Sequence, residues 1–319
     1  MKYHLIAFVV VAIWGSTFVF TKMLLQSGLS PAQIFTCRFI IAYVLLLGYS
    51  LFTQSSNFRS SSARFLPTGR KNVQSSKFKV QSLKFKDELL MVVLGVTGGS
   101  LYFLTENAAM LYTTATNTSL IVCSCPLFAM LLFAIVYRHS EHISKWQAFG
   151  SVMACVGMAI VVLNGHFVLH LSPLGDMLAF AACLCWAVYS LLVKAVVDKY
   201  STLFITRKVF FYGLLTIIPY YFLNPSEASI FKLSIVNCQL SIILNLLFLG
   251  VVASMLCYLV WNWVISKLGA VVATNWVYFN PITTIFFAWW LLHEQITIWF
   301  LLGTILILTG MYLADRHHT

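Results

Sequence analysis

Hydrophobic residues in this sequence gather in long blocks that are separated by short polar segments. Most blocks are about 20 residues long, the length of an α-helix that crosses about 30 Å of hydrocarbon. Start signals support two of them: Ser172 and Pro173 give an N-cap followed by proline, and Ser144 begins a capping box that ends at Gln147. The pattern predicts ten spans, at about 5–24, 32–52, 88–111, 114–136, 146–163, 174–194, 203–223, 239–265, 271–292 and 297–314.

Composition identifies the class of protein. Of the 319 residues, 60% are hydrophobic and 9% are charged, whereas about a quarter of a soluble domain is charged. The chain therefore has too little polar surface for a soluble globule, and we expect an all-α integral membrane protein. The net charge of +11 does not indicate nucleic-acid binding, because the excess lies in one segment and in short loops.

Lysine and arginine predict the orientation, since loops rich in these residues stay in the cytoplasm. If both termini are in the cytoplasm, 17 of the 20 Lys and Arg residues lie on the cytoplasmic side. The exceptions are Lys22, Arg38 and Lys232. The opposite orientation would translocate nearly all of these charges. We therefore predict cytoplasmic termini and a multi-pass protein of the cytoplasmic (inner) membrane.

Residues 53–86 differ in composition from the rest of the chain. The segment is rich in Ser, Lys and Arg and contains no acidic residue, so it cannot bury a core of its own. We predict a disordered, basic cytoplasmic insertion. It is interpreted as a passive linker, with contact to anionic lipid headgroups as the alternative.

The sequence also repeats itself. At an offset of 155 residues, "LGVTGGSLYFLTENAAMLY" from Leu94 aligns with "LGVVASMLCYLVWNWVISK" from Leu249. This offset pairs Gly95 with Gly250, Asn107 with Asn262, and Pro126 with Pro281, and upstream Trp14 matches Trp186 and Arg38 matches Arg207. We divide the chain into a first five-helix repeat, 1–165, and a second, 166–319.

An odd number of spans in each half inverts the second half relative to the first. Such inverted repeats are typical of alternating-access transporters, whose substrate sites lie near the midplane between the halves. Two alternatives remain open. A passive channel can share the architecture, and a membrane-embedded enzyme for lipid or isoprenoid substrates would need a cluster of Asp, His or Arg at one face.

Several motifs resemble one known family. They are "AIWGSTFVFTK" (12–22), "FTCRF" (35–39), "SKLGAVVATNWVYFNPITTIFF" (266–287) and "LLGTILILTGMYLA" (301–314). Their order and spacing resemble the drug/metabolite transporter superfamily, in its EamA-type branch of ten-helix carriers. The resemblance covers nearly the whole chain except 53–86. It implies a permease, not an enzyme, that exports amino acids or other small metabolites.

Glu106 is a carboxylate inside an apolar span, where a charge costs about 2.5–3.5 kcal/mol and usually faces a cavity or a partner. Arg38 is expected about 9 Å below the outer surface and Glu106 at nearly the same depth, at 1.5 Å of helix rise per residue. A buried ion pair that fixes helix packing is one interpretation. The other is a cavity-facing pair in which Glu106 binds a proton or a substrate amine and Arg38 binds a carboxylate.

Other polar and aromatic residues fall on spans that are expected to line the cavity. Asn107 and Asn262 are amides in mid-span that need neighbouring helices or a polar substrate to bond. Together with Arg38 and Glu106, the candidate substrate-binding residues are Trp14, Tyr102, Asn107, Trp186, Tyr189 and Asn262.

Pro126 and Pro281 lie within spans at equivalent positions, where each removes a backbone hydrogen bond. Paired helix breaks indicate a binding site, and a simple packing kink is the alternative. The histidines and cysteines show no metal-binding spacing, and no nucleotide-binding motif occurs. We therefore expect no metal and no cofactor. The expected partners are a small-molecule substrate, a proton as candidate coupling ion, and membrane lipid.

Overall fold

The computed structural model describes residues 2–62, 85–113, 115–136, 144–163, 172–227, 240–292 and 298–315. Every regular element in these ranges is helical, so the all-α prediction is confirmed for them. In chain order they are α1 (Lys2–Gln26), α2 (Pro31–Ser62), α3 (Phe85–Gly95), η1 (Val96–Ser100), α4 (Leu101–Tyr112), α5 (Ala115–Val122), α6 (Cys125–Val136), α7 (Lys145–Leu163), α8 (Pro173–Val197), α9 (Thr202–Thr216), α10 (Ile218–Leu223), α11 (Leu240–Leu247), η4 (Phe248–Leu256), α12 (Cys257–Leu268), α13 (Ala270–Asn275), η5 (Trp276–Phe279), α14 (Asn280–Leu292) and α15 (Ile298–Asp315).

Six stretches of the described chain are long and apolar enough to cross a membrane. They are Lys2–Gln26, Pro31–Leu51, Phe85–Tyr112, Pro173–Val197, Thr202–Leu223 and Leu240–Leu268. They coincide with the first, second, third, sixth, seventh and eighth predicted spans. The other four predicted spans contain α5–α6, α7, α13–η5–α14 and α15. Their membrane crossing, the inverted topology and the side of the termini stay predictions.

Helix α2 continues beyond its predicted end at residue 52 and reaches Ser62. Residues 53–62 of the predicted insertion are therefore helical in the structure, while the disorder of the insertion stays a prediction. Between Gly48 and Pro67 no glycine or proline interrupts the chain, so the helix can continue past residue 52. Helix α3 starts at Phe85, and the remainder of the predicted insertion, residues 63–84, lies outside the described residues.

Two of the long helices contain a π-helical segment at matching positions. In the first half this is η1, where Gly99 leaves the helical region with φ −133° and ψ −106°. In the second half it is η4. Residues 96–100 correspond to 251–255 at the offset of 155, so the two segments overlap in the repeat. Such segments alter the regular backbone bonding of a helix and are frequent at functional sites.

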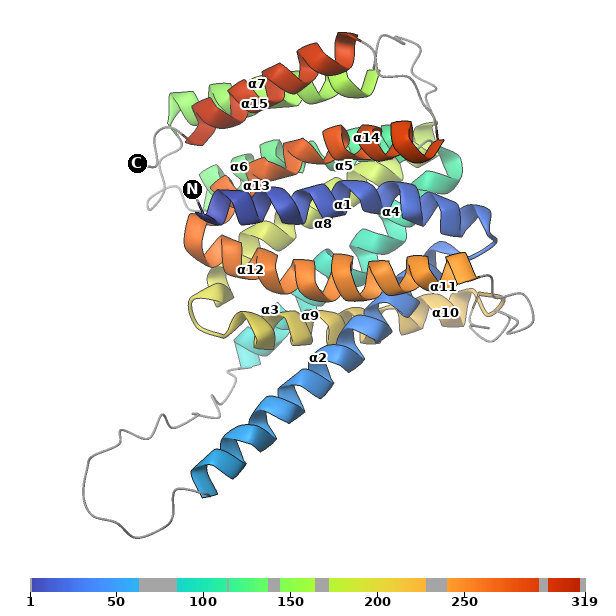
Figure 1. Ribbon diagram of the computed structural model, residues 1–319, viewed down its shortest axis with the longest axis vertical. Helices are drawn as coiled ribbons and strands as arrows, with labels where there is room; N and C mark the ends of the chain where they lie inside the picture. Colours follow the sequence, from blue (N-terminus) through green and yellow to red (C-terminus); the bar gives the residue numbers. More distant parts are fainter. Residues whose placement is uncertain are drawn as a thin grey trace.

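The helices lie in a stack, with α1 near its middle, between α14 on one side and α12 on the other (Figure 1). Helix α8 runs antiparallel to the composite helix α3–η1–α4: Lys199 after α8 bonds Asp87 at the start of α3, and Gly175 at the start of α8 packs on Tyr112 at the end of α4. Figure 1 shows the start of α1 and the end of α15 at the same end of the stack.

Helices α7 and α15 form a close pair at one edge of the stack (Figure 1). A Cβ atom added to Gly150 would lie 2.4 Å from the Gly310 carbonyl oxygen, and one added to Gly310 would lie 2.5 Å from the Ala154 nitrogen. The backbones therefore approach through small residues, as is common between helices in membranes.

Candidate cavity between the two halves

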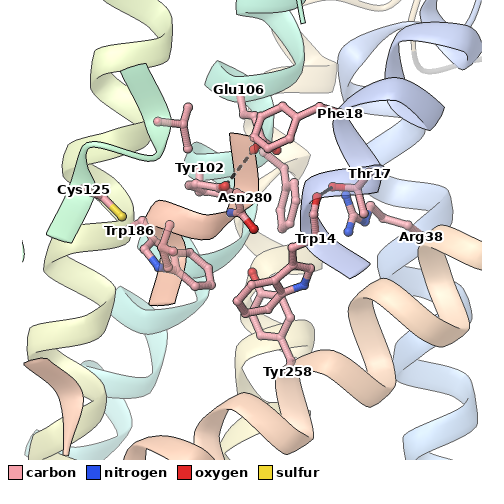
Figure 2. A pocket seen from close by; sticks show the side chains of 13 residues that line it. Trp14, Thr17, Phe18, Arg38, Tyr102, Glu106, Cys125, Trp186, Tyr258 and Asn280 are labelled. Atoms are coloured by element: carbon pink, nitrogen blue, oxygen red, sulfur yellow. Dashed lines mark hydrogen bonds between the residues drawn. The ribbon is translucent and has the colours of Figure 1, made fainter. Parts of the chain in front are cut away.

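A narrow cavity lies at the centre of the stack, where α1, α2, α4, α8 and α12 meet the starts of α6 and α14 (Figure 2). The space open to the centre of a water molecule is about 30 Å³, enough for about two waters. The walls must therefore move before an organic molecule can enter. The cavity is lined by Trp14, Thr17, Phe18, Arg38, Tyr102, Phe103, Glu106, Val122, Cys125, Trp186, Tyr258, Val277 and Asn280.

Glu106 is held in the wall by its own helix. Tyr102, one turn earlier in α4, donates its hydroxyl to Glu106 Oε1 at 2.7 Å (Figure 2). The carboxylate is 6% exposed, and its second oxygen accepts no hydrogen bond from a described residue. Glu106 thus keeps one oxygen available for a ligand or a proton.

Arg38 reaches the same cavity from α2, but it is positioned by other residues. Its Nε donates to the Ser254 hydroxyl at 2.8 Å, and its guanidinium carbon lies 4.2 Å from the centre of the Phe103 ring. The terminal nitrogens donate to no residue that the structure describes. No Arg38 nitrogen lies within 4.0 Å of a Glu106 oxygen, so the two residues line one cavity without forming a direct ion pair.

Aromatic rings form a further part of the cavity wall. The ring centroids of Trp14 and Trp186 are 5.2 Å apart, and Tyr258 lies 5.9 Å from both. Trp14 Nε1 donates to the Ala253 carbonyl at 2.9 Å, and the Tyr258 hydroxyl donates to the Gly98 carbonyl at 2.6 Å. The polar groups of Trp14 and Tyr258 are therefore already hydrogen-bonded to backbone carbonyls of the two π-helical segments.

Three predicted substrate-binding residues do not line the cavity; they bond to protein instead. Tyr189 donates to Asn262 Oδ1 at 2.9 Å, and Asn262 Nδ2 donates to Thr206 Oγ1 at 2.9 Å. Asn107 Nδ2 donates to the Pro31 carbonyl at 3.1 Å. These side chains link helices, because an amide in hydrocarbon bonds to whatever polar group the neighbouring helix offers.

The two prolines lie just beyond breaks in their spans. Pro126 is the second residue of α6, after a turn at residues 123–124, and Pro281 is the second residue of α14, after the 3₁₀ segment η5. Proline fits the first turn of a helix, where its missing N–H has no acceptor to bond. The residues before the prolines, Cys125 and Asn280, both line the cavity and are 155 residues apart.

The predicted set omitted several lining residues for which the sequence contains a signal. Thr17 and Phe18 follow Trp14 by three and four residues, so they share one face of α1. The repeat offset links Phe103 with Tyr258 and Val122 with Val277, and all four line the cavity.

Ionic contacts gather where α3 begins and α9 passes. Lys199 lies 3.4 Å from an Asp87 oxygen, and Lys208 lies 2.6 Å from a Glu88 oxygen. At the opposite end, Lys22 Nζ donates to the Met110 carbonyl at 2.5 Å, near the end of α4. These contacts join the helices at both ends of the stack. Among the described residues, no group of three or more His, Cys, Asp or Glu is arranged to hold a metal.

The family model described as "EamA-like transporter family" matches residues 1–163 and 173–314. The chain belongs to the EamA-like transporter family. A protein of Archaeoglobus fulgidus named "Uncharacterized transporter" is 25% identical over 99% of each chain. A Salmonella typhimurium protein named "Probable amino-acid metabolite efflux pump" is 25% identical, over 97% of this chain and 93% of that protein. One solved crystal structure matches this chain over 98% of both chains, with a TM-score of 0.66 and 16% sequence identity. This match shows a similar fold.

Membership in the EamA-like family confirms the resemblance drawn from the motifs. Together with the apolar helices, it also confirms a multi-pass protein of the cytoplasmic membrane. The family is one of transporters, and a transporter implies a small-molecule substrate.

Proposed function

We propose that this EamA-like protein is a secondary carrier for an amino acid or a related small metabolite, and that it works as an exporter. Ten spans in two inverted five-helix repeats, with both termini in the cytoplasm, move around the central cavity by alternating access. The observation that carries the proposal is a guanidinium and a carboxylate that line one cavity without pairing.

The two charges match the two ends of an amino acid. The terminal nitrogens of Arg38 donate to a substrate carboxylate, since guanidinium is well suited to that group. The available oxygen of Glu106 accepts from a substrate ammonium. The faces of Trp14 and Trp186 contact the apolar part of the substrate. A direct ion pair would have left neither charge available, and its absence supports this assignment.

The size of the cavity supports movement of the walls during transport. A cavity with room for about two waters is too small for an amino acid, so we propose that the halves separate on one side when the substrate binds. The similarity to a Salmonella typhimurium protein named for amino-acid metabolite efflux supports the substrate class.

Counterflow in proteoliposomes tests the proposal. Vesicles loaded with one amino acid at a time should take up the labelled compound faster than empty vesicles, and one class should stand out. Uncoupled flux without exchange stimulation would indicate a channel, and product formation from a lipid would indicate an enzyme. No stimulation by any amino acid, with folded protein, would refute the proposed substrate class.

Glu106 is also proposed to take up the coupling proton. Glu106→Gln should abolish the response of transport to an imposed pH gradient while exchange persists. Glu227→Gln is a matched control, because Glu227 likewise accepts from a tyrosine, Tyr220 at 3.1 Å, but does not line the cavity. An unchanged pH response in Glu106→Gln would refute the coupling role and leave the carrier function standing.

A further inference from the structure

Two hydrogen bonds tie cavity side chains to the π-helical segments. Trp14 Nε1 donates to the Ala253 carbonyl of η4, and the Tyr258 hydroxyl donates to the Gly98 carbonyl of η1. Gly98 and Ala253 are 155 residues apart, which is the offset of the repeat. The two acceptors therefore occupy one position of the repeat, once in each half.

The donors break this symmetry. Trp186 is the repeat equivalent of Trp14, so a symmetrical arrangement would bond Trp186 to the Gly98 carbonyl. Tyr258 occupies that carbonyl instead. The Trp186 nitrogen donates to no residue that the structure describes. One of two equivalent indoles is bound, and the other is available in the cavity.

The neighbours of Trp186 make an exchange feasible. Its ring lies 5.9 Å from that of Tyr258, which holds the Gly98 carbonyl, and 5.2 Å from that of Trp14, at 90° and 87° (Figure 2). Bringing the indole N–H to this acceptor takes a side-chain adjustment together with a movement of the helices.

Inverted repeats give a transporter two opposite-facing states around one site, and exchanging the conformations of the two halves converts one state into the other. Applied to these residues, the exchange bonds Trp186 to Gly98 and releases Trp14 from Ala253. We propose that Trp14 and Trp186 alternate between two roles in each transport cycle. One indole N–H is bound to a π-helical carbonyl while the other donates to an acceptor on the substrate, such as a carboxylate oxygen.

In this structure the substrate-contacting indole is Trp186. The other polar aromatic groups of the lining are already committed: Tyr102 to Glu106, and Trp14 and Tyr258 to backbone carbonyls. The assignment rests on the carrier function proposed above. It adds a specificity residue, whose partner changes with the state of the carrier.

Distance measurements between spin labels test the exchange. Encoded labels at the exposed positions Tyr112 and Met177 report one end of the α4–α8 pair. Labels at Phe85 and Asp198, also exposed, report the end where α3 meets α8. Encoded labels leave the native cysteines in place, and the full chain in lipid nanodiscs is used throughout.

Trp14→Phe removes the bond that holds the present state, so it should shift the population toward the opposite-facing state. Trp186→Phe removes the bond that would hold that other state, and it should shift the population the opposite way. Each shift should be about fivefold in the ratio of the two states, the factor that one net hydrogen bond gives. Tyr258→Phe, which vacates the Gly98 carbonyl for Trp186, should act like Trp14→Phe and replaces it if that variant does not fold.

Shifts in the same direction for Trp14→Phe and Trp186→Phe, or no shift in either, would overturn the exchange. The readout requires no substrate, so it separates this inference from the proposed function. Opposite shifts without counterflow would support the exchange and refute the amino-acid substrate. Counterflow without opposite shifts would support the carrier and refute the exchange.

Discussion

The relation between Arg38 and Glu106 makes a quantitative prediction for a double-mutant cycle. The variants are Arg38→Met, Glu106→Gln and the two together. The structure places both side chains on one cavity without direct contact. We therefore expect their effects on the free energy of unfolding to be nearly additive.

The contacts set the magnitudes. Arg38→Met loses a charged hydrogen bond to Ser254, worth about 1.5–3 kcal/mol, and the contact with Phe103, worth about 0.5–2 kcal/mol. The removed desolvation cost of the guanidinium offsets part of this loss. Glu106→Gln keeps an acceptor for Tyr102 and should cost less than about 1 kcal/mol.

The coupling between the two sites is the decisive quantity. Beyond 4 Å, at an effective dielectric constant of about 20, two unit charges interact by less than about 4 kcal/mol, and water in the cavity reduces this further. We expect a coupling of about 1 kcal/mol. Breaking one side of a direct buried ion pair would cost about 3–5 kcal/mol and would appear as strong coupling.

The assay is reversible unfolding in mixed micelles by titration with sodium dodecyl sulfate, followed by circular dichroism. Arg207→Met is the matched control, because Arg207 is the repeat equivalent of Arg38 and bonds Ser50 at 2.9 Å, away from the cavity. A coupling of about 4 kcal/mol or more between Arg38 and Glu106, which exceeds what charges farther than 4 Å apart can give, would refute the separation seen here and restore the packing interpretation.

Three further results are expected. Gly310→Leu should separate α15 from α7 and lower the free energy of unfolding by about 1–3 kcal/mol or more in the same titration. Thr206→Val should leave Asn262 Nδ2 without its acceptor and cost about 1–3 kcal/mol, while the KM in counterflow stays unchanged. The hydrogen bond to Asp87 raises the pKa of Tyr200 above its usual value, so this contact stabilises the fold below about pH 10 and is lost as pH rises through the raised pKa. Tyr200→Phe should therefore be less stable than the parent at neutral pH, and the difference should narrow in titrations at alkaline pH.

Hydropathy predicted where the helices run because hydrophobic blocks of span length have few alternatives to a helix in a membrane. It did not predict the end of α2, since Ser-rich sequence without glycine or proline continues a helix that is already formed. Composition alone does not separate a loop from such an extension.

The depth estimated from helix rise predicted that Arg38 and Glu106 lie at nearly the same level in the membrane. The alignment of the two repeats paired Trp14 with Trp186. Asn262 shows where such reasoning stops. A span that is apolar on all sides gives no signal for its rotation about its own axis, so the sequence does not say whether an amide faces a cavity or a neighbouring helix. The π-helical segments, which have no sequence signature, change that rotation further.

The two π-helical segments also determine how the chain tolerates changes in length. Each wide turn holds one residue more than an α-helical turn, and one residue in an α-helix corresponds to about 100° of rotation. Deleting Thr97 would let η1 close into regular α-helix and would turn Tyr102 and Glu106 away from the cavity, while Asp87 kept its place before the turn. A relative that lacks one residue at this point would therefore present a different set of side chains to the cavity.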